Sequence, residues 1–167
     1  MSNTHHHLLL LLSLLLPSLA LAFRRPETTP TPLDVIIEGT VRCQSCAYIG
    51  SWSLTSSKPI SSAKVGIACK DHKNRVRFYQ SFKTDNNGYF YAPLKGLVVK
   101  DVVKACSVKL LASADQGCNV LTNVNYGIGG ASLRFEKRLL LGGKSYAVYA
   151  AGPLAFRPAT CAPVVHK

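Results

Sequence analysis

The residues best suited to chemistry in this 167-residue chain are six cysteines, at positions Cys43, Cys46, Cys69, Cys106, Cys118 and Cys161. The first two have the spacing of a zinc knuckle or of a thioredoxin-type redox pair. Zinc would need two further ligands close by, and the other cysteines and histidines are scattered singly. A redox pair normally opens a helix after a strand and keeps a thiolate. An even cysteine count behind an export-like leader favours three structural disulfides, each worth about 2–5 kcal/mol. We therefore expect no metal and no cofactor.

Groups suited to catalysis are few. After the leader, the only histidines are His72 and His166. A serine nucleophile needs a histidine held by a carboxylate, and Asp71 is a weak partner for His72 because neighbours along an exposed turn rarely face each other. The 8 acidic residues are dispersed singly, which does not suit a glycosidase carboxylate pair. We expect a protein that is not an enzyme, and an activity dependent on His72 would be the observation that reverses this expectation.

The N-terminal segments have the composition of a leader and a spacer. Residues 8–16 are nearly all leucine, and Ala20-Leu21-Ala22 supplies a small-x-small cleavage pattern, so residues 1–22 are predicted to be a signal peptide. An uncleaved anchor is the alternative, although the apolar run is short for a membrane span. Residues 23–34 form a Pro/Thr-rich linker, residues 35–163 the single domain, and residues 164–167 a tail. We expect no membrane span after cleavage.

The charge of the chain indicates the class of partner. Lys and Arg number 20 against 8 Asp and Glu, for a net charge of +12, and every charged residue follows position 23. So basic a domain often binds nucleic acid, but a secreted protein rarely meets it. An acidic polysaccharide or an anionic membrane surface fits the compartment better.

Hydropathy of period two predicts strands that would position these groups. In residues 35–43 the core face carries Val35, Ile37, Val41 and Cys43, and Ile36 falls on the other face. Further strands are expected at residues 64–70, 75–83, 89–93 and 106–111, and the last clear strand at residues 144–151. Turns are expected at residues 84–88 and at Gly142-Gly143, and long loops at residues 47–62 and 118–130.

Two surfaces are candidates for binding. If residues 64–70 and 75–83 pair as a hairpin, with Val76, Phe78 and Phe82 toward the core, their outer faces join into one basic surface around Tyr79. Its cations are Lys64, Lys70, Arg75, Arg77 and Lys83. An ordinary solvated strand face is the equal alternative. Trp52, in the long serine-rich loop, either stacks on a sugar ring or caps the end of the core, and we favour the cap.

Three segments of the sequence resemble the plant pollen Ole e 1 allergen and extensin-like family. They are Val35 to Cys46, Ala63 to Cys69, and the turn Thr84-Asp85-Asn86-Asn87-Gly88. Residues 122–127 and 151–161 are similar, more narrowly, to the cysteine-containing C-terminal domain of chimeric arabinogalactan and proline-rich wall proteins. The resemblance implies a β-sandwich or barrel and the disulfides Cys43–Cys118, Cys46–Cys161 and Cys69–Cys106. We thus expect an all-β, disulfide-stapled antiparallel sandwich or barrel of about seven strands with long loops. Relatives carry a longer His-rich or Pro-rich segment before the domain.

The resemblance further implies a secreted, extracellular cell-wall protein without enzymatic activity that binds pectic side chains and wall glycoproteins. Together with the charge, it predicts noncatalytic binding of an acidic or galactan-bearing polysaccharide (pectin) by Lys64, Lys70, Arg75, Arg77 and Lys83, with Tyr79 stacking on a sugar. Binding of neutral galactan would instead involve Trp52 and the tyrosines. The alternative function is an extracellular signalling or defence protein whose partner is another protein.

Overall fold

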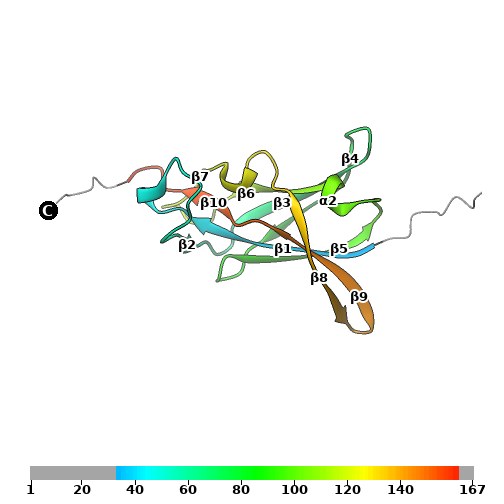
Figure 1. Ribbon diagram of the computed structural model, residues 1–167. Helices are drawn as coiled ribbons and strands as arrows, with labels where there is room; N and C mark the ends of the chain where they lie inside the picture. The colour runs from blue at the N-terminus through cyan, green and yellow to red at the C-terminus, as the bar shows by residue number, and fades with distance from the viewer. Residues whose placement is uncertain (1–32, 162–167) are drawn as a thin grey trace, which may run out of the picture.

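The computed structural model describes residues 33–161 (Figure 1). The elements in chain order are β1 (Leu33–Cys43), η1 (Cys46–Tyr48), β2 (Lys58–Pro59), β3 (Lys64–Lys70), β4 (Val76–Lys83), β5 (Tyr89–Leu97), α2 (Val102–Ala105), β6 (Cys106–Ala112), β7 (Val120–Leu121), η2 (Val124–Tyr126), β8 (Leu133–Leu141), β9 (Lys144–Ala151) and β10 (Leu154–Arg157). The all-β, disulfide-stabilised class is confirmed. The one α-helix of these residues, α2, is a single turn.

The strands form two sheets that share one core (Figure 1). The larger has the order β7-β10-β1-β9-β8, with β2 and β5 also paired to β1, and the smaller has the order β4-β3-β6. β1 is central because β5 and β9 flank its first half while β2 and β10 flank its second. It runs parallel to β9 and β10. The pairing is therefore mixed rather than purely antiparallel.

The apolar face of each sheet packs against the other sheet. The core cluster takes Val35, Ile37 and Val41 from β1, and further buried residues from β3, β5, β6 and β10. Ile36, predicted on the solvent side of β1, is fully buried, as is Val148 beside it on β9. Ile36 lies between Pro93 of β5 and Val148 of β9, so both flanking strands place apolar neighbours beside it, which the alternation along β1 alone could not show.

Three disulfides tie the sheets and loops together. Cys69 on β3 bonds to Cys106, its direct register partner on β6, and this bridge is buried. Cys43 at the end of β1 bonds to Cys118, and Cys46 in η1 bonds to Cys161. These are the pairings that the family resemblance implies.

Turns lie where the sequence predicts them. In residues 84–88, Gly88 has φ +72°, and a Cβ there would lie 2.5 Å from the Val41 carbonyl oxygen, so glycine is required for both reasons. Gly142 and Gly143 both have positive φ and join β8 to β9. β5 continues through Pro93 as an edge strand, a position that tolerates proline.

Some expectations need correction. Val76 is 55% exposed, because a register shift between Cys69 and Lys70 breaks the alternation of the hairpin where Lys70 pairs with Val76. β9 is not the last strand, since β10 follows after the two residues Gly152 and Pro153 and pairs with β1. The residues that the structure describes hold ten strands, two of them only two residues long.

The predicted signal peptide (residues 1–22), most of the linker (23–34) and the tail (164–167) lie outside the described residues. Among residues 33–161, no helix is long and apolar enough to cross a bilayer.

Candidate functional site

The outer face of the three-stranded sheet carries a group of lysine and arginine side chains. In the β3–β4 pairing Lys64 lies opposite Lys83, Ala68 lies opposite Tyr79, and Gly66 lies opposite Ser81. On the other side of β3, Gly66 pairs with Lys109 of β6. Since residues two apart on a strand share a face, these positions form one surface. We call it the basic face, and it consists of Lys64, Lys70, Arg77, Tyr79, Lys83 and Lys109.

Tyr79 lies at the centre of the basic face. It is 60% exposed, and its ring extends over Gly66, where a Cβ would be 3.0 Å from the phenol oxygen and 3.2 Å from a methyl carbon of Leu111. The ring therefore packs against the sheet on one side while the rest of it is open to solvent. Such an aromatic offers an apolar surface with a polar edge.

The cations of the basic face have no acidic partners. Within residues 33–161 the ion pairs are Arg75–Asp71, Lys104–Asp101 and Arg134–Glu136, so no carboxylate of this part lies within 4.0 Å of a basic-face lysine or arginine nitrogen. Their charges repel one another and lower the potential energy of an arriving anion.

Arg75 differs from the other cations proposed at this surface. It precedes β4, and its guanidinium contacts the Asp71 carboxylate at 2.8 Å through both Nε and a terminal nitrogen. This hydrogen bond lowers the pKa of Asp71 from its ordinary value of 3.8 to about 2. Arg75 is thus engaged with Asp71 in the β3–β4 turn, and for this reason we do not count it among the unpaired cations of the basic face.

A second candidate surface surrounds Trp52. Trp52 is 58% exposed, so the expectation that it caps the core is wrong. Its indole packs edge-on against the equally exposed Tyr126, with ring centroids 5.3 Å apart. The indole borders a cavity of about 510 Å³ whose polar lining includes Thr122, Asn123 and Arg157. We call this the aromatic cavity.

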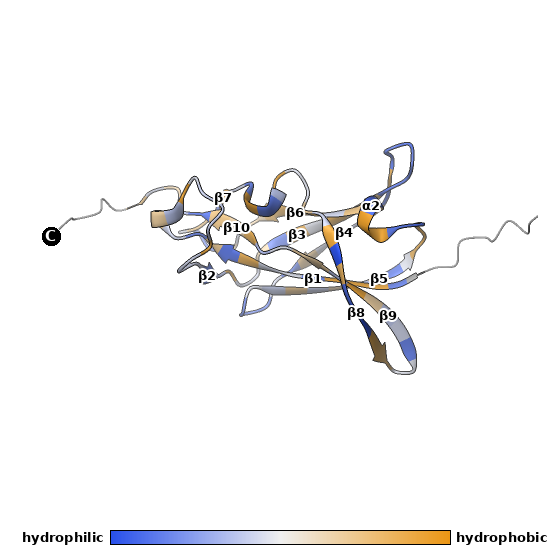
Figure 2. Cartoon of the chain, in the orientation of Figure 1, coloured by the Kyte–Doolittle hydropathy of each residue, from blue (hydrophilic) through white to orange (hydrophobic). Residues whose placement is uncertain are grey.

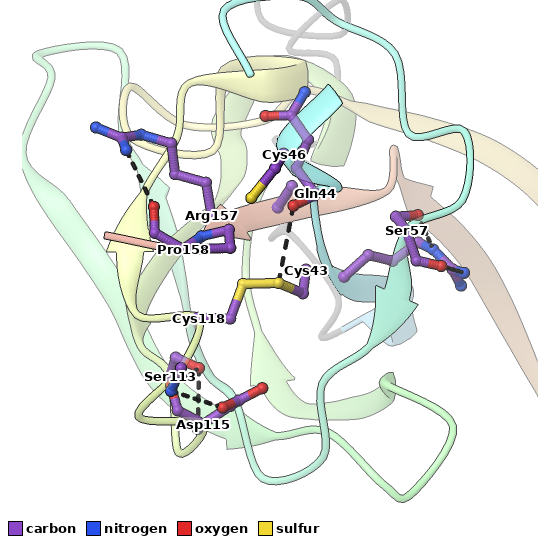
Figure 3. Close-up of a disulfide and its surroundings, with 12 residues drawn as sticks. Cys43, Gln44, Cys46, Ser57, Ser113, Asp115, Cys118, Arg157 and Pro158 are labelled. Atoms are coloured by element: carbon purple, nitrogen blue, oxygen red, sulfur yellow. Dashed lines mark hydrogen bonds between the residues drawn. A yellow bond between two sulfur atoms is a disulfide. The ribbon is translucent and has the colours of Figure 1, made fainter. Parts of the chain in front are cut away.

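The loop that carries Trp52 is held by one buried amide. Gln44 is almost completely buried, and its Nε2 donates to the carbonyl oxygens of Tyr48, Ser51 and Ser53 at 2.9–3.0 Å. Figure 3 shows Gln44 next to the Cys43–Cys118 disulfide and near Cys46. Two disulfides and this amide thus hold in place the long loop predicted at residues 47–62.

Sequence reasoning missed Lys109 on the basic face and, at the aromatic cavity, every residue except Trp52, including Tyr126. Lys109 follows from the alternation of β6, where Cys106, Val108 and Leu110 are buried and Lys109 is exposed. Tyr126 had no sequence signal, because it lies in an irregular segment with φ +61° and approaches Trp52 from 74 residues further along the chain.

The described residues leave His72 without a hydrogen bond to Asp71. The hydrogen bonds of Asp71 come from Lys73 and Arg75, not from His72. Among residues 33–161 no three His, Cys, Asp or Glu side chains gather closely enough to hold a metal ion.

Comparisons with known proteins place the chain among plant proteins. No family model matches. The chain is 33% identical over 133 residues to non-classical arabinogalactan protein 30 of Arabidopsis thaliana, over 76% of this chain and 54% of that protein. It is 36% identical over 99 residues to the pistil-specific extensin-like protein of Nicotiana tabacum (59% and 22%), and 32% identical over 114 residues to proline-rich protein 3 of Arabidopsis thaliana (65% and 36%). The chain spans about half or less of these relatives.

The fold matches that of a solved pollen allergen. The structure of the major plantain pollen allergen Pla l 1 superposes with a TM-score of 0.59 over 78% of this chain and 98% of that one, at 24% identity. None of these relatives is named as an enzyme. The resemblance to the pollen Ole e 1 allergen and extensin-like family is therefore confirmed: the chain is similar in sequence to arabinogalactan, extensin-like and proline-rich proteins of plants and similar in fold to a pollen allergen.

Proposed function

We propose that this is a secreted, non-enzymatic protein of the plant cell wall that binds pectic polysaccharide noncatalytically through the basic face. The observation that carries the proposal is the gathering of Lys64, Lys70, Arg77, Lys83 and Lys109 around one exposed tyrosine, without acidic partners in the described chain. The names of the relatives support the setting in the wall.

The geometry suits a chain of uronate units. The strands of a sheet lie about 4.8 Å apart, and alternate residues along a strand about 6.6 Å apart, so the lysines form a two-dimensional array of cations. Carboxylates of an extended polyanion would approach several of them at once. The ring of Tyr79 would contact the apolar side of a sugar between these charges.

Many weak contacts would make this binding sensitive to salt. A single exposed ion pair contributes about 0.2–1 kcal/mol, so no one lysine carries the affinity. The screening length falls to about 10 Å at 0.1 M salt and about 3 Å at 1 M. Retention on an acidic polysaccharide would therefore decrease steeply as salt rises.

The test compares two variants of equal charge. Lys64→Gln/Arg77→Gln/Lys83→Gln removes three cations from the basic face, and Arg134→Gln/Lys137→Gln/Arg138→Gln removes three from β8. Each lowers the formal net charge from +12 to +9. On polygalacturonate the first variant should elute at much lower salt than the wild type, and the second close to it. Equal losses would mean that net charge alone, and not the basic face, causes retention.

Neutral sugars of pectic side chains form a second candidate ligand, favoured by the aromatic cavity. The exposed Trp52–Tyr126 pair borders polar groups that suit sugar hydroxyls, namely Thr122, Asn123 and Arg157. Binding of a neutral galactan should persist at high salt and disappear in Trp52→Ala. Loss of galactan binding in the basic-face variant alone would contradict this assignment.

A further inference from the structure

A cavity of about 440 Å³ opens at the end of the molecule where the β3–β4 turn meets α2 and the loop before it. In Figure 1 the β4 turn and α2 lie at the same end of the sandwich, and Figure 2 shows the strongly apolar colour of α2 there. We call this the α2 cavity. Its volume lies within the range of about 300–1,000 Å³ that is usual for small-molecule sites.

The lining of the α2 cavity combines apolar and charged groups. Val98, Val99 and Ala105 supply its apolar part, and Val98 is half-exposed although it belongs to the valine-rich run before α2. Lys70, Arg77 and Lys100 supply charge at the same cavity. Such a site suits a ligand with an apolar body and an anionic group.

The acidic residues at the cavity are already engaged. Asp71 is held by Arg75 across the turn. Asp101 accepts hydrogen bonds from the backbone N–H groups of Val103 and Lys104, and the Lys104 ammonium lies 3.6 Å from its carboxylate. No carboxylate of the described chain pairs with Lys70, Arg77 or Lys100, so the cavity presents an unbalanced positive charge.

The two walls of the cavity are covalently fixed to each other. Lys70 follows Cys69 and Ala105 precedes Cys106, and these two cysteines form the buried β3–β6 disulfide. A ligand would thus enter a site whose walls need little reorganisation, which favours affinity.

We propose that the α2 cavity binds a small organic anion with an apolar body, namely an aryl or alkyl carboxylate. The apolar body contacts Val98 and Val99, and the carboxylate lies between Lys100 and the pair Lys70 and Arg77. This inference goes beyond polysaccharide binding, because Val98, Val99 and Lys100 are not part of the basic face.

The experiment titrates the whole folded protein with 2-naphthoate and with the neutral 2-naphthalenemethanol, followed by amide chemical shifts in NMR spectra. We expect saturable one-to-one binding of the carboxylate, with shifts confined to residues 70–77 and 98–105, and much weaker binding of the alcohol. Lys100→Gln should weaken carboxylate binding about fivefold, the equivalent of one exposed charge contact. Val98→Asp should abolish binding, and since Val98 is half-exposed this variant should remain folded.

Two controls separate this proposal from others. Lys95→Gln removes a cation of the same region of the chain that does not line the cavity, and should leave the affinity unchanged. Lys100→Gln and Val98→Asp should retain polygalacturonate binding, so failure of one proposal does not decide the other. Equal affinity for carboxylate and alcohol, nonsaturable shifts, or an unchanged affinity in Val98→Asp would overturn the proposal.

Discussion

The ring of Tyr79 lies across Gly66 of the neighbouring strand, so that a Cβ at residue 66 would be 3.0 Å from the phenol oxygen and 3.3 Å from a ring carbon. Glycine is unfavourable inside a strand unless something approaches closely. Here the close approach is by an exposed aromatic at the centre of the basic face. The absence of a side chain at Gly66 therefore allows the Tyr79 ring to lie close against the sheet.

We predict that Gly66→Val reduces polygalacturonate binding about as much as Tyr79→Ala. The branched side chain would displace the tyrosine ring while its β-propensity maintains the strand, so the melting temperature should not fall substantially. Retention at fixed salt measures the first effect and circular dichroism the second. Tyr91→Ala, at an exposed tyrosine of the other sheet, serves as the control. Unchanged retention in Gly66→Val would exclude a role for the ring orientation.

The disulfides should differ in their reactivity toward reductant. Cys46 and Cys161 are exposed, whereas Cys69 and Cys106 are buried in the core cluster. We predict that mild dithiothreitol, followed by alkylation and mass spectrometry, labels Cys46 and Cys161 first and Cys69 and Cys106 only when the domain unfolds. Simultaneous labelling of all six cysteines would indicate that reduction proceeds through global unfolding.

Removal of the buried Cys69–Cys106 disulfide should lower the free energy of unfolding substantially. Cys69–Cys106 spans 37 residues, which corresponds to about 4 kcal/mol of unfolded-state entropy in the loop-closure treatment. Cys69→Ala/Cys106→Ala also loses core packing, so its denaturant midpoint should fall clearly. A variant as stable as the wild type would mean that the β3–β6 pairing needs no covalent support.

The sequence predicts most of the framework because local patterns encode it. Alternation identifies β3 and β4, and glycines and asparagines mark the turns at residues 84–88 and 142–143. Errors arise where long-range pairing decides the environment. Ile36 is buried because β1 is the central strand, and β10 was overlooked because its four residues pair only after the chain returns to β1.

The candidate surfaces were predictable to different degrees. The basic face follows from strand register, apart from Lys109 on a third strand that one hairpin does not include. The environment of Trp52 was predicted wrongly because its neighbour Tyr126 comes from an irregular segment distant in the sequence. Hydrophobic periodicity cannot reveal a contact of this kind.

The Asp71–Arg75 contact predicts a pH dependence. The Arg75 guanidinium lowers the pKa of Asp71 from 3.8 to about 2. A lowered folded-state pKa contributes stability that is present above about pH 4 and is lost as the pH falls toward 2. Titration of carboxyl ¹³C shifts should give a low pKa for Asp71 in the wild type and a higher pKa in Arg75→Ala. A normal pKa in the wild type would show that the ion pair does not persist in solution.

Trp52, as the only tryptophan, reports directly on the aromatic cavity. Edge-on aromatic pairs contribute about 0.5–1.5 kcal/mol, and the exposure of this pair favours the lower end. We predict that Tyr126→Ala shifts tryptophan emission to longer wavelength and changes the free energy of unfolding by less than about 1 kcal/mol. An unchanged emission spectrum would mean that the two rings do not pack together in solution.

Gln44 links the stability of the domain to the aromatic cavity. Its buried amide donates to three carbonyl oxygens of the Trp52 loop and also lines the cavity. Gln44→Leu keeps much of the side-chain volume but removes the amide that donates to the Ser51 and Ser53 carbonyl oxygens, and the loss of such a hydrogen bond costs about 1 kcal/mol. We predict a loss of that size in chemical denaturation and faster hydrogen exchange confined to residues 47–57. Galactan binding should weaken in this variant while polygalacturonate retention remains, since the loop forms no part of the basic face. Weakening of both would mean that the substitution disturbs the whole sandwich rather than the loop alone.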